Sequence, residues 1–391
     1  MFPERFSNLP AYAFPRLRAL LDSHAPGGEV VNMTIGEPKH PFPDWVPEVL
    51  AANVSGFSSY PPNDGTPELL QNISDWIARR YSVDVSPDRI MALNGSREGL
   101  YNAAMALLPE TKSGKKPCIL IPNPFYQVYM IGALSVAAEP VFVPATADNG
   151  FLPDYASLPN DVLDRTTAAY ICSPANPQGS VADRAYWEVL LGLAEKHDFM
   201  VFSDECYSEI YRSTPPVGVL EVARDMGVNP ERVVIFQSLS KRSNLPGLRS
   251  GFTAAGPEAI KRLRQHRAYS GAPLPLPLQK VAERAWADED HVVENRKMYQ
   301  EKFAIADQIF AEVPGYQGPE GGFFLWLPVE DGEAAALDLW TNTGVRVLPG
   351  AYLSRDVQGT NPGQNYIRVA MVTPKEEMAQ ALKVLRNHLY Q

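Results

Sequence analysis

Short apolar segments alternate with amphipathic helical patterns over residues 45–275, and this alternation constrains the fold more than any other feature of the sequence. Within residues 186–197, for example, Val189, Leu190, Leu193 and Ala194 recur at the spacing of one helix face. Strand–helix–strand units join parallel strands and bury the sheet under helices on both faces. We therefore predict an α/β fold in which helices sandwich a mostly parallel central sheet. Its strands are expected at residues 89–93, 118–121, 140–143, 168–171, 200–203, 232–237 and 250–254.

The pattern changes after the proline-rich stretch 271–278. The elements expected beyond it are a long helix over 290–312, strands over 323–327, 345–348 and 366–369, and a terminal helix over 375–389. This order predicts a smaller α+β domain. The N-terminal segment is too short to form a core alone, so we expect it to join that domain. The predicted division is a large domain of residues 45–275 and a small domain of residues 1–44 with 276–391.

Charge and composition exclude several classes of protein. The chain of 391 residues carries 35 Lys and Arg against 45 Asp and Glu, a net charge of −10, which argues against general nucleic-acid binding. Its apolar runs are shorter than the ~18 residues of a membrane helix, and its start lacks the apolar core of a secretory signal. Cys118, Cys172 and Cys206 suggest neither disulfides nor a zinc cluster. We expect a cytoplasmic protein with no metal and no membrane or nucleic-acid partner.

A lysine directly follows a predicted strand in the run Ser-Leu-Ser-Lys (238–241). At the end of a buried strand, desolvation disfavours the charged form of Lys241 and leaves its amine nucleophilic. Ser238, Ser240 and Arg249 together suit a phosphate group, to which arginine offers a bidentate contact. Taken alone, an exposed lysine in a polar loop explains the same run, and that is the commoner environment for lysine.

The neighbouring predicted strands also end in polar residues. Asp204 and Tyr207 follow one strand, at the edge where α/β sheets bind ligands. Such an aspartate can keep a pyridine nitrogen protonated, and a tyrosine can donate to a phenolic oxygen; a helix N-cap explains Asp204 equally well. Asn176 follows another strand, where a plain Asn-Pro turn accounts for the prolines but not for the amide.

Two further segments contain residues that suit a ligand. Asn-Gly-Ser-Arg (94–97) opens a helix, and free N–H groups at Ser96 and Arg97 attract phosphate, although an ordinary capping turn is the simpler explanation. Tyr126 follows a strand and can stack on a flat ring, although a core aromatic residue is commoner.

In their order along the chain, from the helix start at Ser96 to Arg249, these residues resemble the site of pyridoxal-phosphate enzymes with the aspartate-aminotransferase fold, the class I/II aminotransferases. The similarity covers nearly the whole chain and includes Ile-Gly-Glu-Pro (35–38), Tyr60 with Gly65, Gly-Gly-Phe-Phe-Leu-Trp (321–326), Val-Leu-Pro-Gly (347–350) and Tyr-Ile-Arg-Val-Ala (366–370). It implies a fold-type I transferase that uses pyridoxal 5′-phosphate (PLP). It also implies small amino-acid and 2-oxo-acid substrates and a homodimer with shared active sites.

The resemblance implies a role for each matching residue. Lys241 is expected to bond the cofactor and later to carry a proton, while Asp204 pairs with the pyridine nitrogen. Tyr207 and Asn176 would bond the phenolic oxygen of the ring, and Tyr126 would stack on it. The phosphate contacts are expected from Ser96, Arg97, Ser238, Ser240, Arg249 and, across the dimer, Tyr60. The substrate α-carboxylate is expected at Arg368, with Gly36 beside it.

A narrower resemblance is to the bacterial succinyldiaminopimelate aminotransferases of lysine biosynthesis. It is carried by residues 35–41, 94–98, 122–126, 203–211 and 238–252. It implies amino transfer from N-succinyl-L,L-2,6-diaminopimelate to 2-oxoglutarate. Because this donor has three carboxylates and one arginine fixes only the α-carboxylate, a further cation is expected. We assign Lys39, with help from Arg97 or Arg242; a solvated loop lysine is an equal alternative for Lys39.

Other functions of the same residue set stay open. They include acetylornithine, aspartate and aromatic aminotransferases and carbon–sulfur β-lyases. The effector-binding half of a transcription regulator would need a basic winged-helix segment, for which the chain start is expected to be too short. A homologue without activity is disfavoured because every cofactor position keeps a chemically competent residue.

Overall fold

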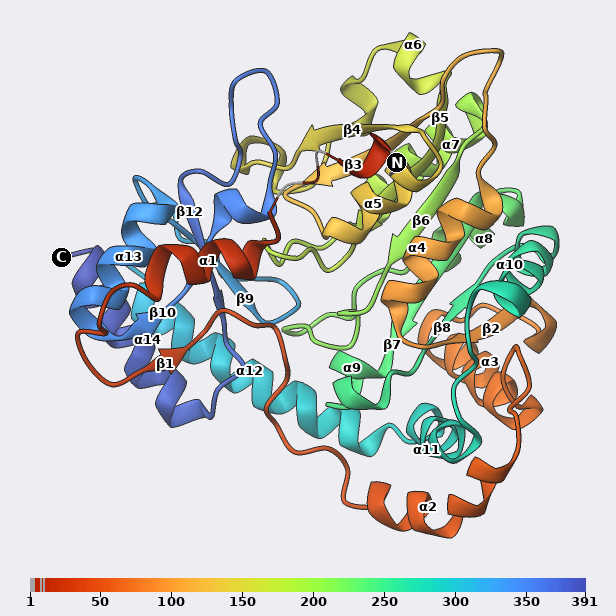
Figure 1. Ribbon diagram of the computed structural model, residues 1–391, viewed down its shortest axis with the longest axis horizontal. Helices are drawn as coiled ribbons and strands as arrows, with labels where there is room; N and C mark the ends of the chain where they lie inside the picture. Colours follow the sequence, from red (N-terminus) through yellow and green to blue (C-terminus); the bar gives the residue numbers. More distant parts are fainter. Residues whose placement is uncertain (1–3, 8, 10) are drawn as a thin grey trace.

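A seven-stranded sheet forms the centre of the larger part of the molecule in the computed structural model, which describes residues 4–7, 9 and 11–391 (Figure 1). The strand order is β2-β8-β7-β6-β5-β3-β4, and only β8 runs antiparallel to its neighbours. The predicted mostly parallel sheet is therefore confirmed. Its strands are Ile90–Leu93 (β2), Cys118–Asn123 (β3), Glu139–Pro144 (β4), Thr166–Cys172 (β5), Met200–Asp204 (β6), Val233–Ser238 (β7) and Gly251–Ala254 (β8).

Both faces of this sheet are buried under helices, because successive strand residues enter two separate cores. Leu120 of β3 belongs to one core, whereas Ile119 and Ile121 belong to the other. The helices of the first core are α3 (Pro67–Tyr81), α7 (Arg184–His197), α8 (Val219–Met226) and α11 (Leu276–Ala287). Those of the second are α4 (Ser96–Leu107), α5 (Gln127–Ser135) and α10 (Pro257–Ser270).

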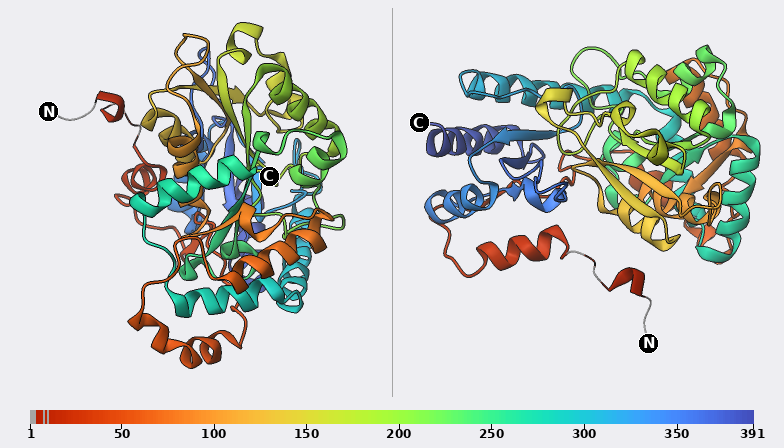
Figure 2. Two further views of the ribbon diagram at one scale, coloured as in Figure 1. Left: turned by 90° about the vertical axis from the view of Figure 1, so that its right-hand side faces the viewer. Right: turned by 90° about the horizontal axis from the view of Figure 1, so that it is seen from above.

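A second, smaller group of strands is formed mainly by the C-terminal part of the chain. Its antiparallel sheet has the order β11-β12-β9, and β1 pairs in parallel with β10. This pairing joins the N-terminal segment to the C-terminal part, and Figure 2 shows α1 lying against that part. The strands are Val31–Asn32 (β1), Phe324–Pro328 (β9), Val345–Arg346 (β10), Leu348–Pro349 (β11) and Tyr366–Ala370 (β12). The helices are Ala13–Leu21 (α1), Asp290–Phe310 (α12), Gly332–Thr343 (α13) and Lys375–Leu389 (α14).

The remaining helices are short, namely Val46–Ala52 (α2), Asn160–Leu163 (α6) and Leu239–Arg242 (α9). The proline-rich break is shorter than predicted, because α11 already begins at Leu276. Pro277 lies in its first turn, where a helix does not need the missing N–H group. The strand predicted over 345–348 is divided into β10 and β11, which join different sheets. The domain limits stay a prediction. No helix within the described part of the chain is long and apolar enough to cross a membrane.

Candidate active site

A cavity of about 240 Å³ lies between the carboxyl ends of the parallel strands and the small sheet. We call it the inner cavity. Parallel strands end at one edge of their sheet, which brings together side chains that are far apart in the sequence. Of the expected site residues, those that line the inner cavity are Gly36, Ser96, Arg97, Tyr126, Asn176, Asp204, Tyr207, Ser238, Ser240, Lys241, Arg249 and Arg368.

Lys241 lies on α9, the single helical turn that follows β7. Its Nζ donates to the carbonyl oxygen of Gly36 at 3.0 Å. Burial is the main reason that the pKa of Lys241 lies below its ordinary 10.5, and the nearby Arg249 guanidinium lowers it further. A larger fraction of neutral amine is therefore present at a given pH, which makes this nitrogen a better nucleophile and base.

Asp204 is the last residue of β6, and its side chain is 3% exposed. Its carboxylate accepts a hydrogen bond from the Tyr129 hydroxyl at 2.8 Å. Burial raises the pKa of Asp204, and the bond from Tyr129 partly opposes that shift. A cationic group placed against this carboxylate would therefore stabilise its charged form. Sequence reasoning missed Tyr129, although its position three residues after Tyr126 puts it one helical turn along α5.

Arg368 projects from β12 and is 5% exposed. Its Nη2 donates to the Thr34 carbonyl at 2.7 Å, and its Nη1 donates to Asn176 Oδ1 at 3.0 Å. Among the described residues, no group accepts a hydrogen bond from its buried Nε. Burial lowers the pKa of Arg368 to about 10, so the guanidinium is still charged at neutral pH. A buried planar cation with unused hydrogen-bonding capacity suits a carboxylate.

Backbone and hydroxyl donors gather where α4 begins. Gly95, which precedes Ser96, has a φ of +82°, and a Cβ atom there would lie 2.3 Å from Arg249 Nη2. Arg249 Nη2 also donates to the Asn94 carbonyl at 3.3 Å. Ser238, the last residue of β7, has its Oγ 3.0 Å from Oγ of Ser240 on α9. A helix start, two hydroxyl groups and a guanidinium in one cavity fit a phosphate monoester.

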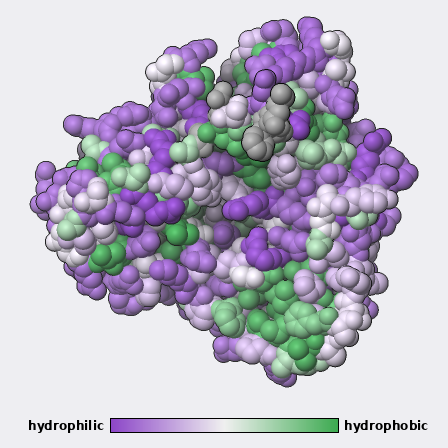
Figure 3. Space-filling model, in the orientation of Figure 1, coloured by the Kyte–Doolittle hydropathy of each residue, from purple (hydrophilic) through white to green (hydrophobic). Residues whose placement is uncertain are grey.

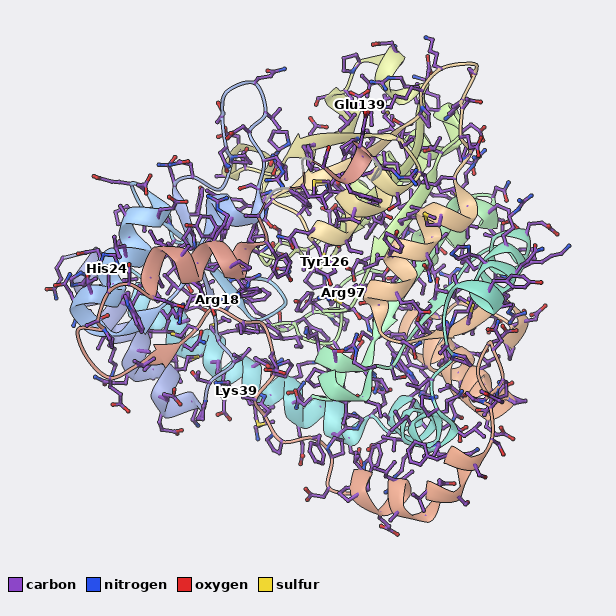
Figure 4. All side chains as sticks on the ribbon, viewed as in Figure 1. Arg18, His24, Lys39, Arg97, Tyr126 and Glu139 are labelled. Carbon is purple, nitrogen blue, oxygen red and sulfur yellow. The ribbon has the colours of Figure 1, made fainter. Side chains whose placement is uncertain are left out.

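Tyr207 and Tyr126 supply the aromatic part of the wall. Tyr207 is 6% exposed and packs edge-on against Phe323 and Phe324; burial raises the pKa of its hydroxyl. The Tyr126 hydroxyl accepts a hydrogen bond from Arg97 Nε, and Figure 4 shows these two side chains beside each other. A flat polar ring in this cavity would therefore contact both apolar surfaces and hydroxyl groups.

Three expected residues lie outside the inner cavity. Tyr60 is fully exposed, and Lys39 is exposed on the loop before α2, apart from Arg97 and Tyr126 (Figure 4). The helping role expected for Arg242 is wrong, because its buried guanidinium pairs with Glu289 at 2.7 Å and donates to the Ala285 carbonyl. Within the described ranges, no group of three or more His, Cys, Asp or Glu could hold a metal ion.

Residues 28–385 match the family model for aminotransferase class I and II. The LL-diaminopimelate aminotransferases of Dehalococcoides mccartyi and Moorella thermoacetica are each 31% identical to the chain, over 98% of its length and 98% and 97% of theirs. An aminotransferase structure from Neisseria meningitidis superposes with a TM-score of 0.92 and 39% identity over 97% of both chains. Aminotransferase AspB from Helicobacter pylori gives a TM-score of 0.91 and 32% identity, over 98% of this chain and 99% of that one.

An amine, a buried carboxylate, aromatic surfaces and a phosphate cradle in one cavity fit PLP, the cofactor of this fold type. Fold and site thus define a PLP-dependent transferase with a fold of type I. The chain belongs to the class I and II aminotransferase family.

Gly95→Ala should weaken PLP binding about 10-fold or more, because the new methyl group displaces the Arg249 guanidinium from the phosphate cradle. The dissociation constant is measured by titrating the cofactor-free enzyme with PLP and following absorbance. Gly114→Ala is the matched control, since Gly114 has a φ of +72° and open space around it. Both variants place a side chain at a positive φ, so the control also carries backbone strain, and equal PLP affinities would contradict the assignment of the cradle.

Proposed function

We propose that the protein transfers an amino group from N-succinyl-L,L-2,6-diaminopimelate to 2-oxoglutarate in the diaminopimelate and lysine pathway, giving N-succinyl-2-amino-6-oxopimelate and glutamate. The observation that carries this proposal is a second cavity of about 350 Å³, which we call the outer cavity. Two guanidinium groups, from Arg97 and Arg355, line it together with mainly apolar and aromatic residues, and among the residues that the structure describes no acidic side chain does. The residues it shares with the inner cavity are Tyr12, Arg97, Phe125, Tyr126 and Gln127.

The charge of the outer cavity favours the succinylated donor over free L,L-diaminopimelate. The succinyl arm is a neutral amide that ends in a carboxylate, which two guanidinium groups attract. Free L,L-diaminopimelate also has a carboxylate on its distal carbon, but that carbon carries an ammonium group as well, which these cations repel, and the carboxylate of the succinyl arm is missing. L,L-diaminopimelate is the second candidate, because the curated relatives are LL-diaminopimelate aminotransferases.

Each site residue has a part in this proposal. Arg368 binds the substrate α-carboxylate with the unused part of its guanidinium. Asp204 would pair with the pyridine nitrogen of the cofactor, Tyr207 and Asn176 would bond its phenolic oxygen, and Tyr126 would stack on its ring. Lys241 would hold the cofactor before substrate enters, and its freed Nζ would then take the proton of the substrate α-carbon and deliver it to the cofactor carbon that carries the transferred amino group. PLP, when bound, supplies the electron-withdrawing ring that makes this proton acidic.

A homodimer with shared sites belongs to the same proposal. Tyr60 is fully exposed, and Val54 and Phe57 nearby in the sequence are 57% and 58% exposed. Figure 3 shows apolar residues gathered on this side of the molecule, over α2 and α11. Burying these side chains against a second copy would be favourable and would bring Tyr60 to the phosphate site of that copy.

The substrate is tested with a panel of donors given singly to the PLP-loaded enzyme with 2-oxoglutarate. We expect N-succinyl-L,L-diaminopimelate to have the highest kcat/KM, measured as glutamate formed. The panel includes L,L-diaminopimelate, acetylornithine, aspartate, phenylalanine and cystathionine. A higher value for L,L-diaminopimelate would establish the second candidate, and release of pyruvate with ammonia would mark a lyase.

Lys241→Ala should abolish the covalent attachment of PLP and lower turnover at least ~10²- to 10⁴-fold, the usual contribution of a proton carrier. Treatment with borohydride followed by peptide mass spectrometry should find the cofactor on Lys241 of the unaltered enzyme and nowhere in the variant. Lys261→Ala removes an exposed lysine from α10 and serves as the control. Undiminished turnover by Lys241→Ala would reject the assigned role.

Shared sites predict that two defective chains complement each other. Tyr60→Phe should weaken PLP binding about 10-fold, as expected for one lost hydrogen bond to a phosphate. A mixed dimer of Tyr60→Phe and Lys241→Ala chains then contains one site with both native residues. Turnover at limiting PLP should therefore rise when the variants are refolded together. No rise would place Tyr60 in the site of its own chain or in none.

A further inference from the structure

We propose that Arg355 recognises the far carboxylate of the donor and so determines the preference for a succinylated substrate. The choice of substrate class rests on the proposed function. Arg355 follows the short helical turn that begins after β11, and it lines the outer cavity. Arg355 is half-buried, and in the described part of the chain no carboxylate lies within 4.0 Å of its guanidinium nitrogens.

The position of Arg355 is fixed by a contact between the two parts of the molecule. Asn123, the fully buried last residue of β3, accepts from the Arg355 N–H at 2.9 Å and donates to the Arg355 carbonyl at 2.8 Å. Next to this pair, the Phe125 N–H donates to the Leu353 carbonyl at 2.9 Å. The Arg355 backbone is therefore held against the segment that also places Tyr126 in the inner cavity.

The Arg355 side chain has only weak partners. Its guanidinium lies 5.8 Å from the centre of the buried Phe125 ring, and one nitrogen lies 4.0 Å from Met130 Sδ. Burial lowers its pKa, and the charge of Arg16 lowers it further. Asp356, the adjacent acidic residue, raises the pKa of Arg355 but makes no ion pair with its guanidinium. An anion in the outer cavity would relieve this unfavourable burial of charge.

The other cations near the outer cavity are less suited to this role. Arg16 already pairs with Glu333 at 2.9 Å and lies over the Tyr352 ring. Arg97 donates to the Tyr126 hydroxyl and lines both cavities, so it lies where the two cavities join. Lys39 lines neither of them. Arg355 lines the outer cavity but not the inner one, as expected for a contact with the end of a long substrate.

The test compares two ligands that differ only in the far carboxylate, N-succinyl-2-aminopimelate and N-propanoyl-2-aminopimelate. Both lack the reactive amine, so their binding to the PLP-loaded enzyme is measured by calorimetry without turnover. We expect the succinyl compound to bind about 10- to 100-fold more tightly, the usual contribution of a charged hydrogen-bonded pair. Arg355→Met should remove this preference and leave the affinity for the propanoyl compound unchanged.

Two further variants make the outcome specific. Arg355→Lys keeps the charge without the planar fork and should keep part of the preference; it also serves if Arg355→Met does not fold, which thermal melting and cofactor absorbance reveal. Arg386→Met on α14 is the matched control and should keep the full preference. No preference in the unaltered enzyme would overturn the proposal. So would a preference that survives in both Arg355 variants, or one that only Lys39→Ala removes.

Measurements of turnover distinguish a failure of this inference from a failure of the proposed function. If N-succinyl-L,L-diaminopimelate is not converted but the binding preference depends on Arg355, the proposed reaction fails and the recognition of a far carboxylate stands. If the donor is converted and Arg355→Met lowers its kcat/KM no more than that of L,L-diaminopimelate, the proposed reaction stands and the role of Arg355 fails.

Discussion

Two backbone carbonyl groups of one N-terminal segment hold the two cations on which the site depends. The Thr34 carbonyl accepts from Arg368 at 2.7 Å, and the Gly36 carbonyl accepts from Lys241 at 3.0 Å. Arg368 belongs to the small sheet and Lys241 follows the large one, so this short segment ties side chains of both parts into one cavity. A Cβ atom on Gly36 would lie 2.4 Å from Phe324 Cζ, which explains why glycine is needed for so close an approach.

Local charge in the cavities is opposite to the charge of the whole chain. The net charge is −10, yet Arg97, Arg249, Arg355, Arg368 and Lys241 line the two cavities. A phosphorylated cofactor and carboxylate substrates are both anionic, and clefts focus the field of the groups that line them. Arginine suits the carboxylate positions better than lysine, because a guanidinium keeps its charge when it is buried. Lysine suits the reacting position for the opposite reason, since burial readily frees its amine.

The inner cavity could be predicted from the sequence because its residues follow strands of one parallel sheet. Asp204 and Lys241 are far apart in the chain, but β6 and β7 are neighbours whose ends meet at one edge. Arg242 shows the limit of this reasoning. It follows Lys241 directly, but each residue in a helical turn points about 100° away from the one before, and Arg242 turns into the core.

The outer cavity could not be predicted in this way, because its wall joins segments that no periodic pattern links. Asn123 and Arg355 are 232 positions apart, and their contact depends on how the two parts of the molecule pack. Tyr12 comes from the N-terminal segment and lines both cavities, again through packing alone. The antiparallel direction of β8 likewise depends on the path of the chain and not on the composition of the strand.

The division into two cavities separates reaction from recognition. The groups of the inner cavity would contact the α-amino group, the α-carboxylate and the cofactor, which are common to all substrates of an aminotransferase, so they give little discrimination between donors. Discrimination must then come from groups that meet the rest of the side chain. We assign this role to groups in loops outside the sheet edge, near Tyr12 and in the 352–355 turn, which a family can vary without disturbing the strand ends. The contact between Asn123 and Arg355 fixes the 352–355 turn to the carboxyl end of β3. A residue in this turn can therefore be held as rigidly as the residues of the inner cavity.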